Sequence, residues 1–272
     1  MSKGKEELLT FGGHLEVLRR MLFRIIAAVA VIAVLVFCFK DVTFDLLLAP
    51  TSNSFCLYGW VENLSSLLGL NFKFEEFDVS LISTELSAQF MTHMTSSLYL
   101  ALLLVSPYIL FELFAFVAPA LYDDEKRKSF IVVLVVYLLF ALGVLLSYYI
   151  LFPISFRFLA TYQVDSSVEN TVTLSSYIST FATLTFMMGL VFQLPVVSYL
   201  LAKLGLIASD TLKNYRRHAL MAITVLSAII TPPDVLTCIL VMGPLYLLYE
   251  CSIVVVMFAE KNRNLNNVPH HQ

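Results

Sequence analysis

Residues 106–128 read SPYILFELFAFVAPALYDDEKRK, an apolar segment that carries one carboxylate and a proline and then ends in a dense cluster of charge. This pattern is typical of a membrane-spanning helix that returns to water. Polar groups at membrane depth are rare and usually have a function. Glu112 lies inside the apolar part, and Glu125 lies just beyond it, where a carboxylate can receive a cationic ligand. The stretch therefore indicates a membrane receptor for something basic.

The composition of the whole chain is that of an integral membrane protein. Of the 272 residues, 59% are hydrophobic and 14% are charged, whereas a soluble domain has about 25% charged residues. Residues 129–156 and 175–202 are apolar runs, each longer than the ~20 residues that a helix needs to cross the hydrocarbon core.

Hydropathy and proline positions predict an all-α fold with a single integral membrane domain, residues 1–272, and six transmembrane helices. The predicted spans are residues 21–39, 90–118, 130–152, 177–202, 218–231 and 235–258. The TPPD sequence at residues 231–234 separates the last two spans, because a proline pair cannot continue a helix. The apolar stretch before it yields only ~18 Å of helix against a core of ~30 Å, so we expect a short fifth and a short sixth helix.

Lysines and arginines are distributed unevenly around these spans. With an even number of spans, both termini share one side. Of the 17 basic residues, thirteen lie on that side, Arg24 lies inside the first span, and three lie on the opposite side: Lys40, Lys73 and Arg157. The positive-inside rule therefore predicts that both termini are cytoplasmic. Residues 40–89, on the other side, are acidic and long enough to fold as a cap.

The chain shows no motif of a catalytic or metal site. HExxH, GxSxG and Walker sequences are absent, and the apolar spans hold no serine–histidine or paired-aspartate arrangement. The four cysteines have no CxxC spacing, so neither a disulfide framework nor a metal centre is supported. We therefore expect neither enzymatic activity nor a cofactor.

Polar residues within the apolar spans lie close to prolines, which suggests kinked helices around a cavity. The polar residues are Glu112, Gln193, Thr231, Asp234 and Glu250, and the prolines are Pro119, Pro195, Pro232 and Pro233. A satisfied hydrogen bond between helices is the alternative explanation for Gln193 and Thr231. It explains the acids less well, because an unpaired carboxylate at the bilayer centre costs ~2.5 to 3.5 kcal/mol.

Four ordered segments resemble the TatC family, the multi-spanning receptor core of the twin-arginine translocase. HLEVLRR at residues 14–20 resembles the family's HLEELRxR, and residues 106–127 resemble SPxxLxxxWxFxxPxLYxxER. Residues 186–205 resemble GxxFExPxxxxxLxxxG, and residues 216–250, with TPPD and LLYE, resemble the fifth and sixth helices. The resemblance spans nearly the whole chain. It implies six spans, cytoplasmic termini, a concave body and short fifth and sixth helices.

The resemblance also implies a function in the bacterial inner membrane. Family members bind the twin-arginine signal peptides of folded cargo proteins. They assemble with single-span subunits of the TatA and TatB type and with further copies of themselves, and transport uses the proton motive force.

Glu125 matches the glutamate of the LYxxER motif and is predicted to be the main arginine acceptor, since a carboxylate can accept a guanidinium in bidentate fashion. An ion pair with Lys128 or Arg127 is its alternative. Phe116 matches the aromatic residue of the same motif and is predicted to shape the floor for the peptide's apolar segment, or else to pack in the core.

The chain departs from the family pattern at two places. Val17 replaces the second glutamate of the HLEELR motif, and the neighbouring Glu16 side chain is turned by ~100° on a helix. Either Glu16 substitutes in part, beside Arg19 of the same motif, or recognition relies on Glu125 with Asp123 or Asp124. The second departure is an exchange: the family often has an amide at the position of Glu112 and a glutamate at that of Gln193. We hypothesise that either helix can supply one protonatable group to the concave face.

The remaining predictions concern partners and shape. Thr231 matches a family position where single-span subunits dock, and Gln193 is predicted to contribute to the same partner-binding surface. Asp234 is predicted to cap the sixth helix, with a direct role in cargo passage as the alternative. Pro50 is predicted to shape the external cap.

Two competing functions remain open. One is a secondary transporter of a small ion or solute around Glu112 and Gln193; such transporters usually show paired repeats, which this sequence lacks. The other is a noncatalytic membrane scaffold.

Overall fold

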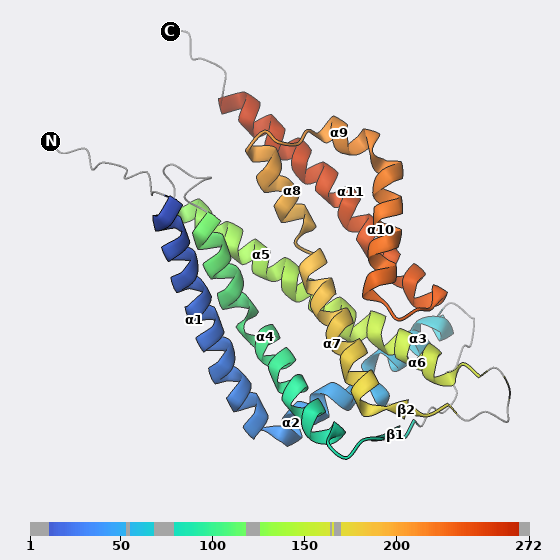
Figure 1. Cartoon of the computed structure of the whole chain (residues 1–272). Coiled ribbons are helices and arrows are strands. Elements are labelled where there is room, and N and C mark those ends of the chain that lie inside the picture. The colour runs from blue at the N-terminus through green and yellow to red at the C-terminus, as the bar shows by residue number, and fades with distance from the viewer. Residues whose placement is uncertain are drawn as a thin grey trace, which may run out of the picture.

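The computed structural model describes residues 11–52, 55–67, 79–117, 126–163, 165 and 170–266. Helices dominate this part of the chain (Figure 1). The helical elements are α1 (Phe11–Cys38), α2 (Lys40–Leu48), η1 (Ala49–Thr51), α3 (Cys56–Leu67), α4 (Ala88–Val117), α5 (Lys126–Leu146), η3 (Ser147–Leu151), α6 (Phe152–Thr161), α7 (Leu174–Val191), α8 (Leu194–Lys203), α9 (Ser209–Asn214), α10 (Arg216–Ile230) and α11 (Val235–Asn266). Two short strands, β1 (Leu81–Ile82) and β2 (Val172–Thr173), pair in parallel.

Five helical segments of the described chain are long and apolar enough to cross a membrane. They are Leu15–Cys38, Ala88–Leu113, Val132–Thr161, Leu174–Lys203 and Val235–Lys261. The sixth segment, α10, has 15 residues, which give about 22 Å of helix and leave it shorter than the ~30 Å core. This confirms the prediction of a short fifth helix.

The prediction of a short sixth helix is wrong. Helix α11 has 32 residues and continues past the end of the predicted span at residue 258. Residues 259–266 are polar, but they contain neither proline nor glycine. Loss of apolar character therefore ends the membrane-facing part of the helix without ending the helix itself.

The third span is longer than predicted because Pro153 does not end it. The π-helical turn η3 precedes the proline, and Pro153 then occupies the first turn of α6, where its missing N–H group has no helical partner to lose. The helix therefore continues to Thr161. Arg157 lies on α6, with its guanidinium 4.9 Å from the centre of the Tyr58 ring.

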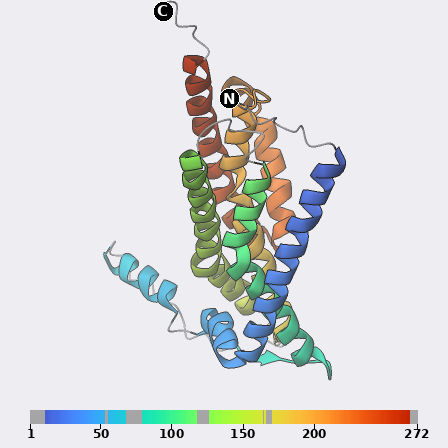
Figure 2. The same cartoon turned by 90° about the vertical axis from the view of Figure 1, so that its left-hand side faces the viewer.

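Residues from the predicted external cap form α2, η1 and α3 at the end of the bundle away from the last turns of α11 (Figure 2). Tyr177 of α7 donates a hydrogen bond to the Leu47 carbonyl at 2.8 Å. Pro50 is buried in η1, and the Tyr58 hydroxyl lies 3.4 Å from the Pro50 carbonyl oxygen and 3.4 Å from the Pro153 carbonyl oxygen of α6. Burial raises the pKa of Tyr58, which keeps its hydroxyl protonated to a higher pH than that of an exposed tyrosine. The cap is thus tied to the bundle by tyrosine hydroxyls.

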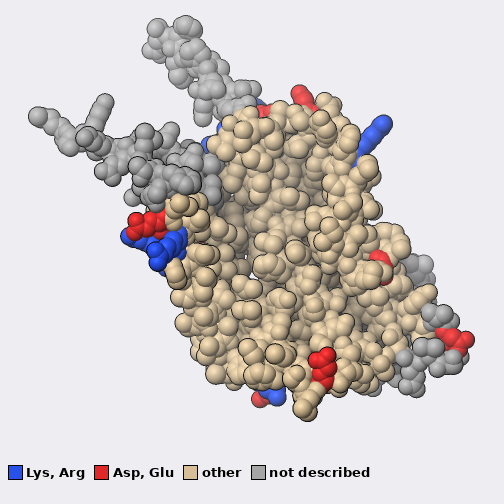
Figure 3. Space-filling model, in the orientation of Figure 1, with Lys and Arg blue, Asp and Glu red and all other residues tan. Residues whose placement is uncertain are grey.

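The helices form a hollowed body. Helix α1 packs along α4, α5 along α7, and α11 along α8 and α10. The start of α1 and the end of α11 lie at the same end of the bundle (Figure 1). Figure 3 shows this face hollowed near its middle, between the side formed by α1 and α4 and the side formed by α10 and α11. This is the concave body that the sequence resemblance implies.

Candidate functional site

An ion pair joins α1 to α4 inside the membrane-spanning segments. Arg24 donates from its Nη2 atom to Glu112 Oε2 at 2.7 Å, and the Tyr108 hydroxyl donates to Glu112 Oε1 at 2.8 Å. The side chain of Glu112 is 11% exposed, whereas that of Arg24 is 57% exposed. Both carboxylate oxygens therefore have donors. Sequence reasoning singled out Glu112 but missed Arg24 as its partner, although a lone arginine in an apolar span calls for a carboxylate nearby.

The first three turns of α1 carry two residues of the predicted signal-peptide site, Glu16 and Arg19. Glu16 forms an ion pair with Arg20 one turn along the helix, and both side chains are exposed. The Arg19 guanidinium lies 5.6 Å from the centre of the Phe23 ring. Val17, which replaces the family's second glutamate, is exposed. Glu16 therefore offers an accessible carboxylate that already holds one guanidinium.

The opposite wall of this predicted site is only partly described. Phe116 lies at the end of α4, one turn beyond Glu112, and is partly buried. Because α1 and α4 pack along their length, Glu16 and Phe116 lie at the same end of this helix pair. The predicted residues Pro119, Asp123, Asp124 and Glu125 fall in residues 118–125, outside the described residues.

Gln193 lies at a break between α7 and α8. Its Nε2 atom donates to the Val136 carbonyl of α5 at 3.0 Å, and its Oε1 atom is buried without a hydrogen-bond partner among the described residues. Pro195 occupies the first turn of α8, where a proline starts a helix favourably. The hydrogen bond between helices predicted as the alternative for Gln193 is therefore present. No hydrogen bond joins Gln193 to Glu112 among the described side chains.

The TPPD turn joins α10 to α11. Thr231 is buried and its hydroxyl donates to the Ser227 carbonyl at 2.9 Å, within its own helix. The Asp234 Oδ1 atom accepts the Thr237 N–H group at 2.6 Å, and the backbone of Asp234 donates to Pro232 at 2.7 Å. Pro232 and Pro233 prevent α10 and α11 from joining into one helix, because a proline has no N–H group for a helical hydrogen bond. The predicted capping contact of Asp234 is thus confirmed.

Replacement of Asp234 by alanine is expected to lower the free energy of unfolding by about 1 kcal/mol, because the Thr237 N–H group loses its acceptor. Asparagine at this position is expected to retain most of the stability, since its side-chain oxygen caps equally well. Thermal unfolding of both variants in detergent tests this order. If Asp234→Asn is as unstable as Asp234→Ala, the carboxylate charge at the start of α11 contributes more to stability than the capping hydrogen bond.

Two further polar contacts connect α11 to its neighbours at the end where α11 terminates. Arg216, the first residue of α10, donates to Glu250 Oε2 at 2.7 Å, and Tyr246 donates to the other oxygen at 3.2 Å. Glu260 accepts the N–H group and the hydroxyl of Ser209 at 3.0 and 2.6 Å, so a carboxylate of α11 caps α9. Sequence reasoning identified Glu250 as a polar intramembrane residue but neither of these partners.

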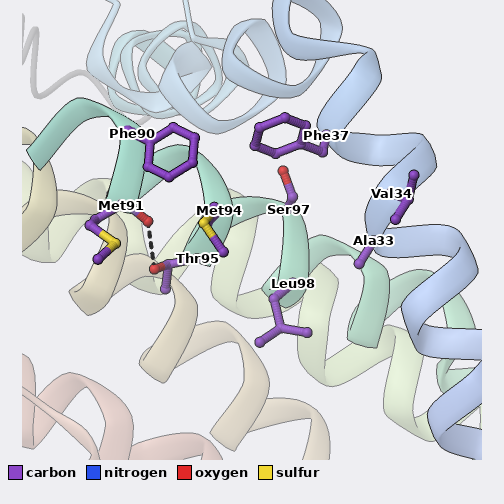
Figure 4. A pocket seen from close by; sticks show the side chains of 9 residues that line it. All are labelled: Ala33, Val34, Phe37, Phe90, Met91, Met94, Thr95, Ser97 and Leu98. Carbon is purple, nitrogen blue, oxygen red and sulfur yellow. Dashed lines mark hydrogen bonds between the residues drawn. The ribbon is translucent and has the colours of Figure 1, made fainter. Parts of the chain in front are cut away.

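An apolar groove of about 510 Å³ lies between α1 and α4, in the half away from Glu112 (Figure 4). Phe37, Phe90, Met94 and Leu98 are among the side chains that line it. Such walls suit hydrocarbon, and none of the side chains that line the groove is a carboxylate that could pair with a guanidinium. The groove is therefore separate from the acidic groups at the other end of the same helices.

Comparison with known proteins decides the family. Residues 13–244 match the family model described as Sec-independent protein translocase protein (TatC). The chain belongs to the TatC family. The TatC protein of Desulforapulum autotrophicum is 33% identical to it over 92% of this chain and 85% of the relative. The TatC protein of Campylobacter jejuni is 33% identical over 89% of this chain and 91% of the relative.

Solved structures agree with this TatC assignment. A crystal structure of the twin-arginine translocase receptor TatC has a TM-score of 0.71 and 30% sequence identity, covering 90% of this chain and 99% of the solved one. A second TatC structure, determined in DDM, has a TM-score of 0.72. Membership of the TatC family together with the apolar helices makes this chain a multi-pass protein of the bacterial inner membrane and a component of a Tat complex.

Proposed function

We propose that this chain is the receptor subunit of a twin-arginine translocase. It binds the twin-arginine signal peptides of folded cargo proteins and nucleates the translocation assembly, as a receptor without catalytic chemistry of its own. The observation that carries this proposal is the match to solved TatC receptors in both sequence and fold along nearly the whole chain. The accessible acidic group at the start of α1 agrees with a cationic ligand.

The chemistry of the proposed site is recognition of guanidinium groups by carboxylates. A guanidinium presents a planar fork of donors that a carboxylate accepts in two parallel hydrogen bonds. Glu125 is proposed as the main acceptor, with Glu16 and Asp124 contributing, and Phe116 as part of the floor. Glu16 already pairs with Arg20, so a peptide arginine would exchange for an internal one at this position. Such an exchange makes both binding and release of the peptide easier, because the Glu16 carboxylate has an arginine partner before and after each step.

Site-specific photocrosslinking from position 125 tests the receptor function. The probe is a signal peptide with consecutive arginines, compared with its twin-lysine counterpart, in membranes that contain the full chain. Crosslinks to the twin-arginine peptide alone are expected. Equal crosslinking of both peptides, or none with either, would overturn the recognition assignment and favour the transporter alternative.

The partial substitution by Glu16 makes a separate prediction. Glu16→Gln is expected to weaken crosslinking of the twin-arginine peptide several-fold, and Glu125→Gln is expected to abolish it, since charge-assisted hydrogen bonds are about twice as strong as neutral ones. Glu62→Gln, a charge-neutralising change on α3 at the opposite end of the bundle, serves as the control. Unchanged crosslinking in Glu16→Gln would exclude Glu16 from the site.

Orientation and partners complete the proposal. Both termini are proposed to be cytoplasmic, because thirteen of the 17 basic residues then lie on the cytoplasmic side. Single-span subunits of the TatA and TatB type are proposed as partners at a surface that includes Thr231 and Gln193, with self-association in the complex. The proton motive force is proposed as the energy source. Labelling of a cysteine placed at residue 217 by an impermeant reagent from the periplasmic side would contradict this orientation.

A further inference from the structure

Two arginines form the polar end of an otherwise apolar face of α1. Glu16, Arg20 and Arg24 are spaced four residues apart and therefore share one helix face. The side chains of Arg20 and Arg24, here called the arginine stripe, are 72% and 57% exposed. Further along the same face, Val31 and Leu35 are 61% and 49% exposed. The stripe thus stands at the polar end of a surface that faces hydrocarbon.

The stripe lies at the depth of the lipid headgroups. The membrane-spanning segment begins at Leu15, so Arg24 lies nine residues inside it, or ~14 Å along the helix. Side chains on a helix point back toward its N-terminus, and long basic side chains extend toward the membrane surface. The Arg24 guanidinium therefore reaches the boundary layer, close to the level of Arg20. This layer holds the phosphate groups of the lipids.

The donors of the stripe outnumber the acceptors that the described chain offers. A guanidinium carries five N–H donors, and the hydrogen bond to Glu112 uses one Nη atom of Arg24. Arg19, Arg20 and Arg24 oppose the carboxylates of Glu16 and Glu112, which leaves one net positive charge in this group. Figure 3 shows basic and acidic residues together at the edge where α1 begins, beside surface that carries no charged residue. The net positive charge and the free N–H donors of this group attract an anion.

We propose that the arginine stripe binds the phosphate of an anionic phospholipid in the leaflet next to the start of α1. The guanidinium fork matches phosphate oxygens, and the acyl chains would lie along Val31 and Leu35. The Arg24–Glu112 pair holds one guanidinium in place for the lipid, since Glu112 is itself fixed by Tyr108. This inference does not depend on the binding of signal peptides.

Lipid retention measured by native mass spectrometry tests the proposal. The full chain is reconstituted in vesicles of equal phosphatidylglycerol and phosphatidylcholine, extracted in detergent, and its bound lipids are counted. Phosphatidylglycerol is expected to be retained in excess, and Arg20→Gln is expected to reduce that excess about fivefold, the factor for ~1 kcal/mol per arginine near an anionic surface. Retention of the two lipids in equal amounts by the unchanged protein would overturn the proposal.

Three comparisons separate the site from general charge effects. Arg217→Gln removes the same charge from an exposed position of α10 outside the stripe and is expected to change nothing; an effect as large as that of Arg20→Gln would overturn the proposal. The double variant Arg24→Gln with Glu112→Gln removes the second arginine without leaving a carboxylate unpaired, and a further loss of retained phosphatidylglycerol is expected.

Millimolar inorganic phosphate is expected not to displace the lipid, and displacement would indicate a site for free phosphate instead. Because the assay contains no signal peptide, its failure would leave the receptor proposal standing.

Discussion

Glu112→Gln and Arg24→Gln are each expected to destabilise this chain by about 2 kcal/mol, and the double variant is expected to be more stable than either single one. Removal of one partner leaves the other charge unpaired; an unpaired ionised side chain costs ~2.5 to 3.5 kcal/mol at the bilayer centre and less toward the boundary. The cost is reduced here because Arg24 is half exposed. In the double variant, two amides can still form a hydrogen bond between α1 and α4, worth about 0.6 to 1.7 kcal/mol in lipid.

Thermal unfolding of the four proteins in nanodiscs measures the coupling. A matched control is the exposed Lys213–Asp210 pair on α9, whose charges are 3.3 Å apart, and its neutralisation is expected to change stability by less than about 0.5 kcal/mol. Additive losses in the double variant at positions 24 and 112 would show that the two side chains do not stabilise each other. That result would contradict the ion pair described above.

The same variants test whether transport needs a protonatable group at Glu112. We expect Glu112→Gln to lower the export of a twin-arginine cargo, because an amide cannot exchange a proton. Export must be compared at equal amounts of folded protein in the membrane, so that lost stability is not counted as lost transport. Export at the unchanged rate would show that no such group is required at this position.

Gly143→Ala is expected to destabilise the chain by about 1 to 3 kcal/mol, the usual cost of overpacking. A methyl group at Gly143 of α5 would lie 2.6 Å from the Met188 carbonyl oxygen and 2.9 Å from the Phe192 ring. The obstacle includes backbone of α7, which cannot turn aside as a side chain can. Close approach through small residues is how membrane helices gain packing contacts, since lipid offers no hydrophobic driving force between them.

Two further glycines provide graded controls for this contact. A methyl group at Gly189 would lie 2.7 Å from the Phe140 ring, which can rotate, so a smaller loss is expected. At Gly243 of α11 nothing lies within 4 Å, and alanine is expected to stabilise the helix by up to about 1 kcal/mol. Unfolding temperatures should therefore rise in the order Gly143→Ala, Gly189→Ala, Gly243→Ala. Equal temperatures for the three variants would contradict the close contact of α5 with α7.

Local features of the site could be predicted because their contacts are local in sequence. Asp234 caps α11 through a residue three positions away, and the pattern of an acid after a proline pair indicates this directly. Partners distant in sequence were missed: Arg24 and Glu112 are separated by 88 positions, and Ser209 and Glu260 by 51. A single sequence does not indicate which helices become neighbours. The sequence therefore showed that Glu112 needs a partner, but not that the partner is Arg24.

The sequence by itself determined the membrane class, the long apolar spans and the short α10, because each apolar helix satisfies its own backbone hydrogen bonds within the bilayer. Those are properties of single segments. Only the tertiary structure decided which charges pair, where glycines let α5 and α7 touch, and that tyrosines tie the cap to the bundle. It also decided the length of α11, whose polar last turns include Glu260, bound to Ser209 of α9. These outcomes depend on side chains meeting across helices, which hydropathy along one segment does not encode.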